Sequence, residues 1–136
     1  SAASDVYKRQ MLKRRKEIIM RYDSAFRPLG VETLDHYTES HSSSGHLYIT
    51  RIPGITEDSR NEIIIKMAER GIACNVHYKP LPMHTAYKNL GFDIADYPNA
   101  YAHFANEITL PLHTCLTDED VDYVIRQYTE ILKEYI

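Results

Sequence analysis

The sequence predicts an α/β or α+β fold in which a small sheet is covered by helices. Apolar residues recur at helical spacing in several segments, and three short segments between them are rich in β-branched and aromatic residues. The predicted order is helix, strand, helix, strand, helix, strand, helix, without an internal repeat. A hydrophobic content of 43% with 26% charged residues is typical of a soluble, globular domain.

The first predicted helix covers residues 12–26, where apolar side chains recur every three or four positions. Pro28 and Gly30 are expected to end it, because proline disfavours helical geometry before it and glycine permits the exit turn. Residues 31–45 are polar and form an unusually long loop, which is often a functional feature. The alternating, β-branched segment 46–52 predicts a strand.

A second helix is predicted to begin after Thr56 or Asp58, either of which can cap it. It should run to about Arg70, since Gly71 suits the position that follows a helix. The segment 72–78, IACNVHY, predicts the second strand.

The next segment is punctuated by prolines. Residues 79–84 predict a loop and residues 85–92 one or two helical turns, while 98–107 predicts a helix with proline in its first turn. Residues 108–112 predict a short strand near a sheet edge, because Pro111 cannot donate a ladder hydrogen bond.

The clearest element is the last helix, which begins at Thr117 with acidic residues in its first turn. Its apolar stripe is Val121, Val124, Ile125, Tyr128, Ile131, Leu132 and Tyr135.

The composition argues against several classes of function. A formal net charge of −3 does not favour nucleic-acid binding, and no apolar run has the length of a membrane span. Two cysteines, Cys74 and Cys115, without CxxC spacing fit a reducing cytoplasm. The seven histidines show no zinc-site spacing, so no metal site is predicted. Nucleophile elbows and glycine-rich phosphate loops are also absent.

The first ten residues, SAASDVYKRQ, are expected to be foreign to the domain. They resemble the translation of a transposase-type sequencing adaptor, and such additions are set aside in fold reasoning. A natural helical N-terminus with Asp5 as its cap is the alternative. On the first interpretation the domain comprises residues 11–136.

His77 and Tyr78 are the candidate site that residue chemistry alone suggests. They end the predicted strand 72–78, where ligands of α/β sheets bind, and two prolines stiffen the following loop. The alternative is a half-buried histidine beside a packing tyrosine.

Motifs in the second half of the chain follow one another in a characteristic order. They are Gly71-Ile72, His77-Tyr78-Lys79-Pro80-Leu81, Tyr87, Tyr97-Pro98, Leu110-Pro111-Leu112 and Thr117 to Val121. The strand HLYITR, residues 46–51, and the helix around Arg14 to Tyr22 precede them. In this order and spacing, residues 12–136 resemble the C-terminal part of the DegT/DnrJ/EryC1/StrS aminotransferases.

The resemblance implies the small C-terminal domain of a fold-type I transferase that depends on pyridoxal phosphate. In this family the cofactor and its anchoring lysine lie in a large N-terminal domain, so no residue of this chain is expected to be catalytic or to bind the cofactor. The complete enzyme, a cytoplasmic homodimer, would transfer an amino group from glutamate to a keto nucleotide-sugar for surface polysaccharide synthesis. The fragment alone is expected to be inactive.

The same resemblance assigns roles to four residues of a substrate site. His77 and Tyr78 would contact the sugar or its phosphates. Lys79 would pair with a pyrophosphate oxygen as a point charge. Arg51 would hold a carboxylate in a bidentate fork, the alternative being a solvated charge at a strand end.

One departure from the family pattern concerns the loop after these residues. The family usually has Leu-His after His-Tyr-x-Pro, whereas here Leu81 is followed by Pro82, with His84 two residues further on. Whether His84 replaces the family histidine stays open.

A second class of function also suits the order of elements. A non-catalytic α/β module that binds a small molecule, or that dimerises, would show the same pattern of helices and strands. Such a module would fold by itself and bind its ligand without a cofactor.

Overall fold

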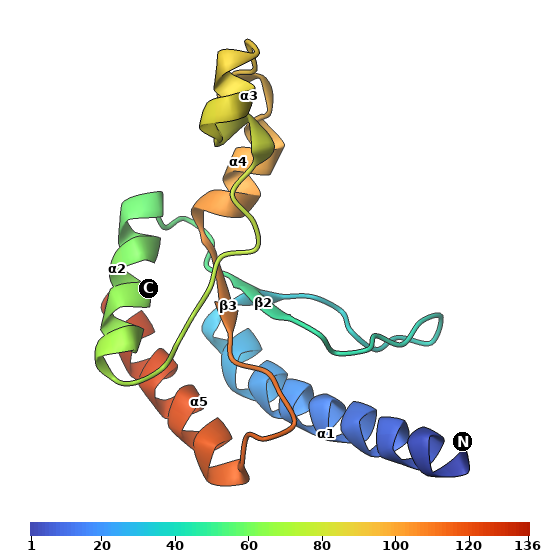
Figure 1. The fold of residues 1–136 in the computed structure, drawn as a ribbon. Helices are drawn as coiled ribbons and strands as arrows, with labels where there is room; N and C mark the ends of the chain where they lie inside the picture. The colour runs from blue at the N-terminus through green and yellow to red at the C-terminus, as the bar shows by residue number, and fades with distance from the viewer.

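Three helices pack against one face of a three-stranded antiparallel sheet with strand order β1-β2-β3 (Figure 1). The computed structural model describes residues 1–136. The strands are β1 (Glu32–Thr33), β2 (Tyr48–Arg51) and β3 (Glu107–Leu110), and the three helices are α1 (Ala2–Phe26), α2 (Glu57–Glu69) and α5 (Asp118–Leu132). The predicted fold class, a small sheet with helices, is thereby confirmed.

The core lies between the sheet and these helices. Alternation along β2 and β3 directs Tyr48, Thr50, Ile108 and Leu110 toward them, and all four side chains are buried. A cluster of 17 buried residues joins this face to α1, α2 and α5. The opposite sheet face carries no such apolar layer, as is common for antiparallel sheets.

Local capping explains why α2 and α5 form where the sequence predicts them. The Thr56 side chain accepts a hydrogen bond from the backbone of Ser59 at 3.1 Å, and Gly71 leaves the helix with φ of 79°. Thr117 and Asp120 cap each other reciprocally at the start of α5.

Helix α1 is longer than the predicted helix 12–26, because it begins at Ala2. Ser1 caps it by accepting a hydrogen bond from the backbone of Ser4 at 3.3 Å, so Asp5 lies in the first turn and is not the cap. Residues 2–10 are exposed throughout. The buried side of α1 consists of Ile18, Ile19, Tyr22 and Phe26.

The predicted strand 72–78 is wrong. Only Asn75 pairs there, in an isolated antiparallel bridge with Thr109. The pairing stops because the backbone N–H of His77 donates to the Glu107 side chain at 2.8 Å, not to its carbonyl. His77 and Tyr78 therefore do not end a strand of a parallel sheet.

The predicted loop 31–45 contains a strand that the sequence did not reveal. The two residues of β1 pair with Arg51 and Thr50 of β2. The strand predicted at 108–112 is confirmed as β3, which begins one residue earlier and ends two residues earlier. β3 lies at the sheet edge as expected.

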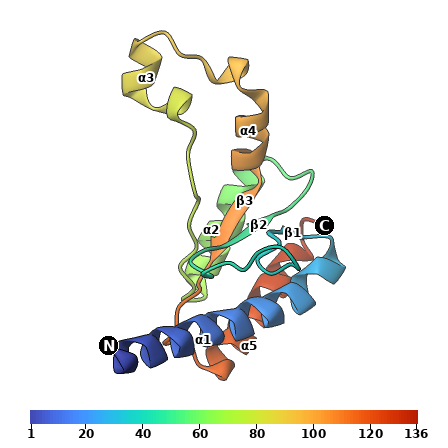
Figure 2. The ribbon, with the colours of Figure 1, turned by 90° about the vertical axis from the view of Figure 1, so that its right-hand side faces the viewer.

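Residues 81–101, termed the arm, project away from the sheet and its helices (Figure 2). The arm contains α3 (Thr85–Asn89), the first half of α4 (Pro98–Ala105) and two 3₁₀ helices, Leu81–Met83 and Ile94–Asp96. None of its side chains is buried. No helix of the chain combines the length and hydropathy of a membrane span.

Candidate functional site

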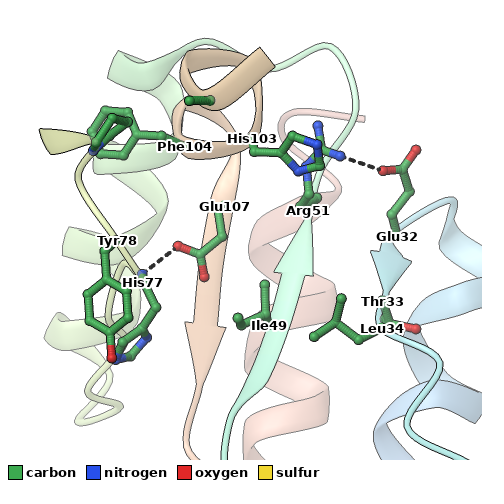
Figure 3. Close-up of a pocket in the computed structure, with 12 residues that line it drawn as sticks. Glu32, Thr33, Leu34, Ile49, Arg51, His77, Tyr78, His103, Phe104 and Glu107 are labelled. Atoms are coloured by element: carbon green, nitrogen blue, oxygen red, sulfur yellow. Dashed lines mark hydrogen bonds and ion pairs between the residues drawn. The ribbon is translucent and has the colours of Figure 1, made fainter. Parts of the chain in front are cut away.

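A cavity of about 440 Å³ lies on the sheet face opposite the core helices (Figure 3). All three strands, α4 and the segment after Asn75 contribute to it. Its lining residues are Glu32, Thr33, Leu34, Ile49, Arg51, His77, Tyr78, Pro80, Ala100, His103, Phe104 and Glu107. The structure thus brings three of the four predicted site residues, Arg51, His77 and Tyr78, to one cavity.

A row of charged side chains crosses the sheet at this cavity. Strand register places Arg51 opposite Glu32 on one side and Glu107 on the other. The Arg51 guanidinium lies 3.4 Å from a carboxylate oxygen of Glu32, and its Nε donates to Asn106 Oδ1 at 3.2 Å. The carboxylate that Arg51 holds in this chain is therefore that of Glu32.

Glu107 is the buried member of this row, with 3% of its surface exposed. Its Oε2 accepts from the backbone N–H of His77 at 2.8 Å, and its Oε1 accepts from the Thr109 hydroxyl at 2.5 Å. Burial raises the pKa of Glu107, and these two hydrogen bonds partly oppose that shift. His77 Nδ1 lies 2.8 Å from Thr109 Oγ1, which completes a chain from the imidazole to the carboxylate.

The rings of His77 and Tyr78, which are neighbours at the cavity wall, differ in their exposure to solvent. His77 is half-buried, whereas Tyr78 is 74% exposed. Their ring centroids lie 4.7 Å apart with the planes at 88°, and the peptide bond between them is cis. An exposed phenol beside a cavity is free to hydrogen-bond a polar ligand.

Lys79 does not line the cavity, and its side chain is exposed. His84 Nε2 lies 3.2 Å from the Lys79 carbonyl oxygen, so His84 holds the loop and is also outside the lining. The fourth predicted site residue is thus separate from the other three.

Sequence reasoning missed Glu107 and Thr109. The sequence did contain a signal for them. Polar and apolar residues alternate from Glu107 to Leu110, and in a strand this alternation places the two polar side chains on one sheet face. Reading 108–112 as the strand left Glu107 outside it.

A buried arginine fixes the corner between α4 and β3 beside the cavity. Arg60 of α2 donates to the carbonyl of Phe104 at 2.6 Å and to that of Glu107 at 3.2 Å. Its guanidinium also lies 4.6 Å from the centroid of the Phe104 ring. Arg60 thereby positions two lining residues.

The residues that line this cavity do not fit a covalent pyridoxal-phosphate site. No lysine lines the cavity, and its arginine is already paired with Glu32. Histidine, cysteine, aspartate and glutamate side chains form no group of three that could hold a metal ion. The polar groups that the cavity offers include the Tyr78 hydroxyl and the imidazoles of His77 and His103.

Residues 7–129 match the model of the DegT/DnrJ/EryC1/StrS aminotransferase family. The chain is 33% identical to the spore coat polysaccharide biosynthesis protein SpsC of Bacillus subtilis over 90% of this chain and 32% of the relative. It is 27% identical to the UDP-4-amino-4,6-dideoxy-N-acetyl-beta-L-altrosamine transaminase of Helicobacter pylori over 92% of this chain and 33% of the relative.

Among solved structures, the chain resembles Spr1654 of Streptococcus pneumoniae, a candidate sugar aminotransferase. The apo form aligns with a TM-score of 0.90 and 55% identity over 93% of this chain and 32% of that protein. The same protein has also been solved in forms with pyridoxal phosphate and pyridoxamine phosphate. The chain thus spans about a third of the length of its relatives, at 32% of both SpsC and Spr1654. Because the family model covers most of the chain and the fold agrees, the chain belongs to the DegT/DnrJ/EryC1/StrS aminotransferase family.

Proposed function

We propose that residues 11–136 form the small domain of a pyridoxal-phosphate-dependent aminotransferase that acts on a keto nucleotide-sugar. The observation that carries this proposal is the shared cavity of Arg51, His77 and Tyr78 on the polar face of the sheet. The names of two relatives, a spore coat polysaccharide biosynthesis protein and a nucleotide-sugar transaminase, support the substrate class.

In the proposed reaction glutamate donates the amino group and a sugar for surface polysaccharide accepts it, in the cytoplasm. Pyridoxal phosphate supplies the electron sink for amino transfer. A domain outside this chain would hold the cofactor, because the cavity here offers no lysine. This chain would form one wall of the substrate cleft, since ligand sites favour domain junctions.

Within that wall, His77 and Tyr78 would hydrogen-bond sugar hydroxyls or phosphate oxygens. Lys79, outside the cavity lining but in the adjoining loop, would reach a pyrophosphate oxygen as a point charge. Arg51 would keep the cavity rim in place through Glu32 and Asn106.

The exposed apolar side chains of the arm support the proposal that this domain contacts other protein surfaces in the complete enzyme. Leu90 is 75% exposed and Leu81 is 58% exposed, and the arm adds several exposed aromatic rings. Exposed apolar surface of this kind marks an interaction site. We propose that the complete enzyme is a homodimer, which light scattering of the purified enzyme would test.

The decisive experiment uses an enzyme that carries both domains. His77→Ala should raise KM for the nucleotide sugar about tenfold or more, because a hydrogen bond to a polar ligand group is lost. KM for glutamate and the absorbance of bound cofactor should stay unchanged. His113→Ala, an exposed histidine outside this cavity, is the matched control.

Unchanged sugar kinetics in His77→Ala would overturn the assigned contact. The 136-residue chain should form no amino product by itself. Binding of a small ligand by this chain without a cofactor would favour the non-catalytic module instead.

A further inference from the structure

The hydrogen bonds around His77 run in one direction, from the imidazole to a carboxylate. An ionised carboxylate only accepts, so the Thr109 hydroxyl donates its proton to Glu107 Oε1 at 2.5 Å. The hydroxyl oxygen is then left as the acceptor for His77 Nδ1 at 2.8 Å. His77 Nδ1 must therefore carry the proton when the imidazole is neutral.

We infer that Glu107 is a positioning residue which, through Thr109, holds neutral His77 in the Nδ1–H tautomer and presents Nε2 as a hydrogen-bond acceptor. The second carboxylate oxygen accepts from the His77 backbone at 2.8 Å, which fixes the carboxylate against rotation. Figure 3 shows this contact and the exposed ring of Tyr78 beside the imidazole.

The Nε2 atom is free for this purpose. It makes no hydrogen bond within the chain. It is also not fully buried, because Nε2 of His36 is the only fully buried side-chain nitrogen or oxygen atom that lacks a hydrogen-bond partner. A neutral histidine in water favours the proton on Nε2. The network thus reverses the ordinary preference and turns a donor into an acceptor.

An acceptor at this position selects ligands by their donors. A sugar hydroxyl can donate to Nε2, whereas a carbonyl or phosphate oxygen cannot. This consequence rests on the proposed function, while the tautomer itself does not. Glu107 would then set specificity for a hydroxyl without touching the ligand.

The test is long-range ¹H–¹⁵N correlation spectroscopy of the 136-residue chain at about pH 8, above the ordinary pKa of a free histidine. Wild type and Thr109→Ser, which keeps the hydroxyl, should show His77 protonated on Nδ1. Thr109→Val removes the acceptor at nearly constant shape, and Glu107→Gln offers Thr109 an amide donor in place of a carboxylate. Both should move the proton to Nε2.

The exposed His113 serves as the internal control, since its side chain makes no hydrogen bond in the chain and lies outside this cavity, and its signals should be the same in all variants. Wild-type His77 protonated on Nε2, or Thr109→Val with the wild-type pattern, would overturn the inference. If Glu107→Gln fails to fold, Thr109→Val against Thr109→Ser still decides it.

The readout also separates this inference from the proposed function. An Nδ1–H tautomer with unchanged sugar kinetics in His77→Ala would remove the substrate contact and leave the network. An Nε2–H tautomer together with a raised KM in His77→Ala would overturn the network and keep the substrate contact.

Discussion

The backbone N–H of His77 donates to Oε2 of Glu107 at 2.8 Å, where a continuing strand would have used the Glu107 carbonyl. Antiparallel pairing that starts at Asn75 and Thr109 would next join His77 to Glu107. The Glu107 carbonyl accepts instead from Arg60 at 3.2 Å. One carboxylate therefore ends the pairing and turns His77 onto the cavity wall.

This arrangement predicts a pH dependence of stability. Burial raises the pKa of Glu107, so the folded chain keeps this proton to a higher pH than the unfolded chain. From about pH 4.3 upward, the ordinary value for glutamate, the folded state binds more protons and stability falls as pH rises. The free energy of unfolding of wild type minus that of Glu107→Gln should be larger at pH 4 than at pH 7.

Urea denaturation of both proteins across this range measures the difference. The variant lacks the titrating group, so it cancels the contributions of the other carboxylates. A difference that does not change with pH would mean that folding leaves the pKa of Glu107 at its ordinary value.

The buried hydrogen bonds of Arg60 to Phe104 and Glu107 predict a loss of stability when the arginine is replaced. It is 2% exposed, and its NH1 group donates to two backbone carbonyls. Arg60→Met keeps much of the volume but removes the donors, which should cost about 2–3 kcal/mol in chemical unfolding. Arg126→Met is the control, because Arg126 is exposed and lies over the Tyr123 ring at 5.6 Å. Its effect should stay within about 0.5 kcal/mol, and equal losses in the two variants would contradict the assignment.

The helices that the sequence predicted correctly are those whose signals are local. Thr56 and Thr117 cap α2 and α5 through hydrogen bonds to residues three positions away, and Gly71 supplies the left-handed turn after α2. The strand predicted at 72–78 was wrong because the deciding contact is not local. Its alternation is favourable, but Glu107, thirty residues away, captures the His77 N–H.

The same distinction applies to the site. His77 and Tyr78 stand in one motif and Arg51 ends a recognisable strand, so sequence reasoning found them. Glu107 and Thr109 become site residues only through the register of β3 against β2 and the bridge at Asn75, which a local pattern does not contain. Whether Lys79 would line the cavity depended on the course of the loop after Tyr78.

The two cysteines should differ in reactivity. Burial raises the pKa of the Cys74 thiol to about 12, whereas Cys115 is exposed. Because the thiolate is the nucleophile, iodoacetamide at about pH 8 should label Cys115 in the folded chain and Cys74 only after denaturation. Mass spectrometry of the tryptic peptides over time gives both rates, and equal rates in the folded chain would show that Cys74 is accessible.

A buried hydroxyl pair links the sheet to α5. Thr50 Oγ1 donates to the Ile108 carbonyl at 2.7 Å and lies 2.8 Å from the Tyr128 hydroxyl. Since Thr50 has one proton and gives it to Ile108, the Tyr128 hydroxyl must be the donor to Thr50. Both side chains have 0% of their surface exposed, so neither has access to water.

The two single substitutions should therefore be unequal. Thr50→Val leaves the Tyr128 hydroxyl buried without an acceptor and should cost about 1–3 kcal/mol, whereas Tyr128→Phe removes the donor and should cost about 0.5–1.5 kcal/mol. The double variant should be more stable than the sum predicts by at least about 0.5 kcal/mol, because no orphaned donor remains. Urea unfolding of the four proteins measures this coupling. Additive losses would mean that the hydroxyls contribute independently, and a larger cost for Tyr128→Phe would reverse the donor assignment.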